Sequence, residues 1–369
     1  MRLIENFDNW NRLYESAQAS NRAKAINEAE QFDLMKWLKQ QANVAKATQK
    51  IKKLVQDVWK DKTEQLNKEA EFEETWLETA KDKEQEIRDK FKTKISKVSD
   101  KNAKDGLRAQ RKEQLEKLDA ALSELKTAKK DQYLQSVKDD ISRAEKAVEE
   151  IKKLDMPEWG GELVNAMATA EENAQKVTYY NKKYADNEES NEKAQKRLRE
   201  KQTTDAKALA AASEQASLSK ESDATTAIAS IDNEKPTEGA TAEDTATFKE
   251  GKNALKAALQ AYKTANSELA STKRSSAEYK QAEQAAEGAS DDQKEAKQAA
   301  ADSKRAKFDD ALDEFNKAKD KAISAFSKAI SWADNNAQNQ DAQIQKIVNQ
   351  VNGTKPLKDD LEGIDINQD

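Results

Sequence analysis

The sequence predicts an all-α protein, an elongated antiparallel helical bundle with short coiled-coil seams. Three observations lead to this fold class. The 369 residues include only 3 Pro and 8 Gly, so little interrupts a helix. Ala, Glu, Lys, Leu and Arg make up roughly half the chain, a composition that favours long helices and coiled coils, and 64 basic residues nearly balance 70 acidic ones. Apolar residues recur at helical spacing, in runs too short for one continuous zipper.

The apolar runs step by three and four residues, and such short seams suit helices that turn back on one another. In chain order they are Ile51, Leu54 and Val58; Leu115, Leu118, Leu122 and Leu125; Val137, Ile141, Ala144, Val148 and Ile151; Phe308, Leu312 and Phe315; and Ile323, Phe326 and Ile330.

Large side chains are unevenly distributed along the chain. Five of the six tryptophans lie in the N-terminal half, where we expect them to fill a thin helical core. The part before Gly161 is therefore predicted to be the better-packed half. The stretch from Asp186 to Ala301 is rich in small and polar residues, which predicts weakly packed helices there.

Breaks in the helical pattern divide the chain. Asp105-Gly106 is expected to interrupt the first long helical stretch, and Pro157 marks a second break. A turn is expected at Gly288, with Ser290 or Asp291 capping the next helix. The expected organisation is a peptide at 1–17, a Trp-bearing helical region at 18–156, a helical region at 157–232, a linker at 233–244, a C-terminal helical hairpin region at 245–352 and an acidic tail at 353–369.

The residue types that are missing exclude several kinds of chemistry. Without Cys or His, the chain lacks the commonest nucleophile–base pairs, thiol redox chemistry and most transition-metal sites. It has no glycine-rich phosphate loop and no EF-hand spacing, and its longest apolar stretch is far below the ~20 residues that cross a bilayer. We expect no enzyme, cofactor, metal site or small-molecule substrate.

The first seventeen residues form a compact apolar and aromatic peptide. Its apolar residues fall at 4-3-4 spacing, as on one face of a short helix. Glu5 and Asp8 interrupt any hydrophobic core, so the peptide is not an export signal. The predicted targeting or assembly face comprises Leu3, Phe7, Trp10, Leu13 and Tyr14.

This peptide resembles the capsid-targeting peptide of internal head proteins in T-even-like tailed bacteriophages. Those peptides begin with Met, a basic residue, an aromatic or aliphatic residue at four and Phe at seven; here these are Met1, Arg2, Ile4 and Phe7. They end at a prohead-protease site, which Leu13-Tyr14-Glu15-Ser16 fits. The resemblance implies transport into the head and cleavage between Glu15 and Ser16. The alternative is that the peptide simply docks a first helix.

Two basic segments are candidates for contact with packaged DNA, without sequence preference, or with an anionic membrane surface. Leu34 to Gln56 contains no acid, and Arg88 to Lys112 contains ten basic residues against three acids. The alternative is an ordinary solvated helix face. The candidate contact residues are Lys36, Lys39, Lys46, Lys50, Lys52 and Lys53 in the first segment, and Lys92, Lys94, Lys97, Arg108, Arg111 and Lys112 in the second.

The sequence therefore favours a structural virion or prohead protein of a tailed phage, an internal core or cargo protein. Its expected partners are head or scaffold proteins, packaged DNA and further copies of itself. Its expected location is the head interior, and the host cytoplasm during assembly. The alternative is an unprocessed helical component of a tail, neck or fibre, or of another filament or adhesion protein.

Overall fold

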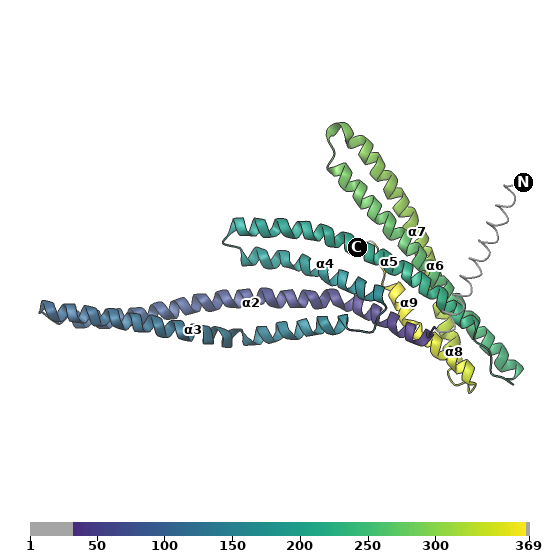
Figure 1. The fold of residues 1–369 in the computed structure, drawn as a ribbon, viewed down its shortest axis with the longest axis horizontal. Coiled ribbons are helices and arrows are strands. Elements are labelled where there is room, and N and C mark those ends of the chain that lie inside the picture. The colour runs from purple at the N-terminus through teal and green to yellow at the C-terminus, as the bar shows by residue number, and fades with distance from the viewer. Residues whose placement is uncertain (1–31, 367–369) are drawn as a thin grey trace, which may run out of the picture. The chain divides into compact units, whose positions relative to one another are not determined.

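The computed structural model describes residues 32–366, and within that range every regular element is a helix (Figure 1). The predicted all-α helical bundle is therefore confirmed. The helices are α2 (Leu34–Ser96), α3 (Lys101–Lys152), α4 (Glu158–Lys183), α5 (Glu188–Asp232), α6 (Ala242–Glu287), α7 (Asp291–Asn335), α8 (Ala342–Gly353) and α9 (Lys355–Glu362).

The described helices belong to two compact units. Unit 1 comprises residues 32–49, 152–167 and 204–366, and unit 2 comprises residues 50–151 and 168–203. The chain passes from one unit to the other within α2, α4 and α5 and at the end of α3. Each unit therefore combines segments that are distant in the sequence.

Unit 1 contains the main apolar core, built on an antiparallel pair of long helices, α6 and α7. Tyr262 of α6 and Phe326 of α7 pack edge to face, with ring centroids 6.0 Å apart, and both are fully buried. Farther along the pair, the hydroxyl of Thr272 donates to the carbonyl oxygen of Ala311 at 2.9 Å. The N-terminal end of α2, the C-terminal end of α5, and α8 and α9 complete this core.

The prediction that the N-terminal half is better packed is wrong, because the Ala-rich helix α6 lies at the centre of the core. Its buried alanines match buried alanines of α7, and small side chains let two helices approach closely. Gly251 extends this effect: a Cβ atom there would lie 2.2 Å from the ring of Trp332 on α7. The core alanines contributed by this pair are Ala258, Ala261 and Ala265 of α6 and Ala322, Ala329 and Ala333 of α7.

The stretch expected as an acidic tail contains helix α9, which packs into the unit 1 core. Leu357 and Leu361, one turn apart, are buried, while Asp359 between them is exposed. Asp360 also forms an ion pair with Lys220 of α5 at 2.5 Å. The expectation of an acidic tail at 353–369 is therefore wrong for residues 355–362, which form a short amphipathic helix.

Unit 2 contains the long α2–α3 hairpin, in which the two helices run antiparallel and side by side (Figure 1). Glu69 and Glu73 of α2 form ion pairs with Lys130 and Lys126 of α3. The parts of α4 and α5 in this unit are also antiparallel: Gln195 Nε2 donates to the carbonyl oxygen of Val177 at 3.4 Å.

The seam of the α2–α3 hairpin repeats every eleven residues. The residues that face the partner helix step by three, four and four, which gives about 3.67 residues per turn and favours a right-handed supercoil. The predicted 3-4-3 seam is wrong at Leu125, which is 52% exposed, because Lys126 takes its place. The seam residues are Trp76, Ala80, Glu84, Ile87, Phe91 and Ile95 of α2 and Lys104, Leu107, Arg111, Leu115, Leu118, Leu122 and Lys126 of α3.

The other predicted seams lie on inward faces. Val137, Val148 and Ile151 are buried in α3, as are Ile51 and Val58 in α2. The C-terminal seams also face inward: Phe315 and Phe326 are buried, and the other members are half-buried, namely Phe308, Leu312, Ile323 and Ile330.

The hairpin turns earlier than the sequence predicted. Residues 98–100 are not helical, whereas Asp105 and Gly106 lie inside α3. Asp100 explains the position of the break, because its carboxylate accepts a hydrogen bond from the backbone N–H of Ala103 at 2.7 Å and caps α3. A single exposed glycine costs a helix only about 1 kcal/mol, so Gly106 does not end it.

Three further breaks coincide with expected ones. The chain is non-helical around Pro157, between α3 and α4. Residues 233–241 separate α5 from α6, where the sequence placed a linker. Residues 288–290 separate α6 from α7, and Ser290 has the extended backbone of an N-cap without a side-chain capping bond.

Candidate functional site

The N-terminal peptide lies outside the described residues. This applies to the predicted targeting face, Leu3, Phe7, Trp10, Leu13 and Tyr14, and to the predicted cleavage residues Glu15 and Ser16. Both remain predictions from the sequence.

The first set of candidate lysines lies at exposed positions of α2, and none forms an ion pair with a described residue. The nearby tryptophans are not free to stack on a base. Trp37 is only 5% exposed in the unit 1 core, and the ring of Trp59 is covered by Tyr179, Lys62 and Lys176. Lys36, Lys39 and Lys46 belong to unit 1, and Lys50, Lys52 and Lys53 to unit 2.

The second set gathers around the turn of the α2–α3 hairpin. Lys92 and Lys94 come from the end of α2, Lys97 from the turn that follows it, and Arg108, Arg111 and Lys112 from the start of α3. We call residues 88–112 the hairpin tip. A helix rises 1.5 Å per residue, so Lys92 lies about 60 Å along α2 from Lys53. The structure therefore does not join the two candidate sets into one surface.

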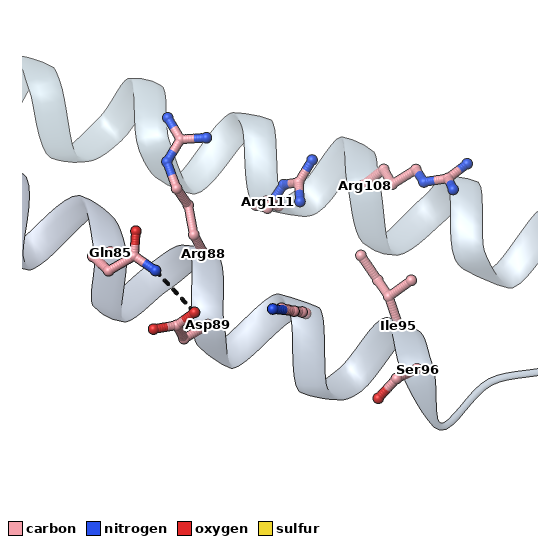
Figure 2. A pocket seen from close by; sticks show the side chains of 8 residues that line it. Gln85, Arg88, Asp89, Ile95, Ser96, Arg108 and Arg111 are labelled. Atoms are coloured by element: carbon pink, nitrogen blue, oxygen red, sulfur yellow. Dashed lines mark hydrogen bonds between the residues drawn. The ribbon is translucent and has the colours of Figure 1, made fainter.

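The hairpin tip contains a shallow, open depression of about 600 Å³ between the two helices. The pairing of Glu73 with Lys126 sets a register that places Arg88 opposite Arg111. Figure 2 shows Arg88 extending from α2 toward α3, where Arg111 and Arg108 lie. The lining residues are Gln85, Arg88, Asp89, Lys92, Ile95, Ser96, Arg108 and Arg111.

The acidic residues of the hairpin tip are all engaged locally. Asp100 caps α3, Asp105 pairs with Arg108 at 2.8 Å, and Asp89 accepts a hydrogen bond from Gln85 at 2.9 Å. Arg88 and Lys112 have acidic partners from just outside the tip, at 3.3 and 3.9 Å. The remaining seven cations form no ion pair with any described residue: Lys90, Lys92, Lys94, Lys97, Lys101, Lys104 and Arg111.

The part of the hairpin next to the tip carries a net negative charge. We call residues 57–87 and 113–151 the hairpin shaft. Its α2 part carries eleven acidic and five basic residues, and its α3 part ten acidic and seven basic residues. The hairpin tip is therefore net positive and the hairpin shaft net negative, in a chain whose net charge is −6.

Sequence reasoning named six cations of the hairpin tip and missed Arg88, which lines the depression. Arg88 is the first residue of the basic segment that ends at Lys112, so the sequence already indicated that it belongs to this positive surface. The misplaced turn concealed its meaning, because a turn at Asp105-Gly106 would have placed Arg88 opposite the polar middle of α3 rather than opposite Arg111.

A second polar cluster lies in unit 1, around Asp223 of α5. One carboxylate oxygen accepts hydrogen bonds from the indole N–H groups of Trp37 and Trp159, at 3.3 and 3.4 Å, and from the amide of Gln41 at 3.5 Å. Burial raises the pKa of Asp223, and the two indole donors partly offset that rise. These bonds tie α2 and α4 to α5, so the cluster has a structural role.

The described residues include no group of three or more acidic side chains placed to hold a metal ion. Within the same range, no helix is long and apolar enough to span a bilayer. Compared with known proteins, the chain matches no family model, no curated protein and no solved structure. Its function must therefore be inferred from its own residues.

Proposed function

We propose that the chain is a structural, non-enzymatic virion or prohead protein of a tailed bacteriophage, and that it resides inside the head. The observation that carries this proposal is the N-terminal peptide. Met1, Arg2, Ile4 and Phe7 have the residue types and positions of a capsid-targeting peptide, and Glu15-Ser16 follows as a cleavage junction.

The fold supports a structural role. The described residues are organised as long helical hairpins whose surfaces carry mixed charge, a form that suits a core or filling protein. The depression at the hairpin tip is open and lined by charged side chains, whereas a catalytic pocket is usually enclosed and largely apolar. Interface residues would therefore perform the function, rather than reactive groups.

The apolar face of the peptide supplies the proposed contact with the assembling head. A helix that presents Phe7, Trp10 and Tyr14 on one side fits a hydrophobic groove on a shell or scaffold protein. Cleavage between Glu15 and Ser16 would then release the body of the protein from that groove.

Mass spectrometry of mature particles of the encoding phage tests this proposal. We expect the chain to be present with Ser16 as its first residue. The Glu15→Gln variant should enter the head but retain Met1, and the Phe7→Ala/Trp10→Ala variant should be missing from the head. Two controls at other polar positions, Asn9→Gln and Asn11→Gln, should behave like the unaltered chain.

An intact Met1 in mature heads would remove the cleavage part of the proposal. Normal incorporation of the Phe7→Ala/Trp10→Ala variant would remove the targeting part. Recovery of the chain with tails, necks or fibres, as a symmetric oligomer with an uncleaved N-terminus, would favour the alternative class of virion component.

A further inference from the structure

We propose that the hairpin tip binds the phosphate backbone of double-stranded DNA without sequence preference. The assignment of this polyanion as packaged DNA rests on the proposed head location. The need for an anion arises from the charge of the hairpin tip itself.

The first argument is uncompensated charge. The hairpin tip carries ten cations and three acids, and each acid is already engaged by a neighbouring residue. Arg88 and Arg111 lie across from each other and both line the depression. Arg88 is paired with Glu84, but Arg111 and six lysines of the tip form no ion pair with a described residue, and an anion bound at the tip would relieve the repulsion among these like charges.

The second argument is the chemistry of the lining residues. Three of the four cations that line the depression are arginines: Arg88, Arg108 and Arg111. A guanidinium group binds phosphate oxygens through two parallel N–H donors, which makes arginine a preferred phosphate contact. The fourth cation, Lys92, adds an exposed ammonium group.

The third argument distinguishes a DNA duplex from other polyanions. Proteins that bind single strands stack bases on aromatic side chains, but Phe91 is the one aromatic residue of the hairpin tip and is only 2% exposed. Binding at a lipid surface uses exposed apolar side chains as well as charge, and none of the large exposed apolar residues lies in the tip. Backbone contacts alone carry no sequence information.

The acidic shaft limits how much DNA one hairpin can contact. It repels phosphates, so a duplex meets the hairpin at its tip, where about four lining cations contact it. The logarithm of affinity should then fall with the logarithm of salt concentration with a slope of about −3.6. Affinity should drop about 150-fold between 50 and 200 mM salt.

Fluorescence anisotropy with the full-length protein and two labelled 20-base-pair duplexes of unrelated sequence tests the proposal. We expect equal affinities for both duplexes and the slope given above. The tip variant Lys92→Gln/Arg108→Gln/Arg111→Gln should reduce the slope to about −1 and weaken binding at least ~30-fold at 100 mM salt. The matched control Lys50→Gln/Lys52→Gln/Lys53→Gln loses the same charge from the same unit and should change affinity less than ~3-fold.

Helical circular dichroism and the melting curve establish that each variant is folded. If the tip variant is not, Lys92→Gln/Arg108→Gln replaces it, because both side chains line the depression and are exposed; the slope should then fall to about −1.8. Equal losses in the tip and control variants would overturn the proposal, as would salt-independent binding.

Two further measurements identify competing partners. Vesicles containing 30% phosphatidylserine, and light scattering without DNA, test an anionic membrane and a second copy of the chain. Tighter binding to vesicles than to the duplex, or a tip variant that loses only self-association, would also overturn the proposal. The chain can fail to bind DNA and still be found in heads, so this result is separate from the test of the proposed function.

Discussion

Replacing Gly251 with alanine should destabilise unit 1, although alanine is the better helix former. A Cβ atom at this position would lie 2.2 Å from two ring carbons of Trp332 and 2.6 Å from a third. Carbon atoms pack at about 3.5 Å, so the ring would have to move by about 1.3 Å. Trp332 is only 7% exposed and has little space into which to move.

The two opposing effects can be compared. Gly→Ala in a helix gains about 1 kcal/mol, whereas overpacking a core costs about 1–3 kcal/mol and sometimes more. We expect a net loss of about 1–2 kcal/mol in the free energy of unfolding of unit 1. Gly161→Ala is the matched control, because a Cβ atom added to this helical glycine of the same unit would have nothing within 4 Å. It should gain up to about 1 kcal/mol.

Urea denaturation followed by circular dichroism measures both changes, and each cooperative transition is fitted separately because the chain has two units. A Gly251→Ala variant as stable as the Gly161→Ala control would refute the close approach of α6 and α7 at Trp332. A second variant, Gly251→Ala with Trp332→Leu, should lose less stability than the sum of the two single changes.

Three further outcomes follow from the unit 1 contacts. Thr272→Val should cost about 1 kcal/mol in urea denaturation, because the buried hydroxyl of Thr272 can donate to Ala311 of α7 as well as to Glu268 of its own helix. Thr264→Val should change little, because Thr264 is exposed and bonds only within its own helix. Leu361→Ala should cost about 2–4 kcal/mol in the same assay, and no effect would mean that α9 does not pack on the core. Burial raises the pKa of Asp223 above its ordinary 3.8, so the folded state binds this proton more tightly than the unfolded state. The stability of the unaltered chain relative to Asp223→Asn should therefore rise as pH falls through the folded-state pKa toward 3.8. A stability difference that does not vary with pH would contradict the buried site.

The sequence was most informative where helical spacing and large apolar residues coincide. The all-α fold and the seams at 51–58, 137–151 and 308–330 follow from spacing alone, because one face of each helix must be buried. Spacing was less reliable where charged residues occupy the seam. Lys126 and Lys130 pair with Glu73, so an inward-facing position can look like a solvated one.

Small residues were the second source of error. Alanine and glycine contribute little apolar area themselves, so a stretch rich in them resembles a weakly packed helix. Their effect appears only in three dimensions, where Gly251 and its neighbouring alanines let α6 and α7 approach. The candidate basic surface also depended on the three-dimensional structure. Its charge was visible in the sequence, but the position of Arg88 opposite Arg111 depends on where the hairpin turns.

Protease treatment of intact and osmotically shocked phage particles tests the central claim most directly. A head-interior protein should resist protease in intact particles and be digested after shock has opened the heads, as followed by an antibody against the C-terminal residues. Digestion in intact particles would place the chain on the outer surface or the tail and contradict the claim, and so would its absence from purified particles.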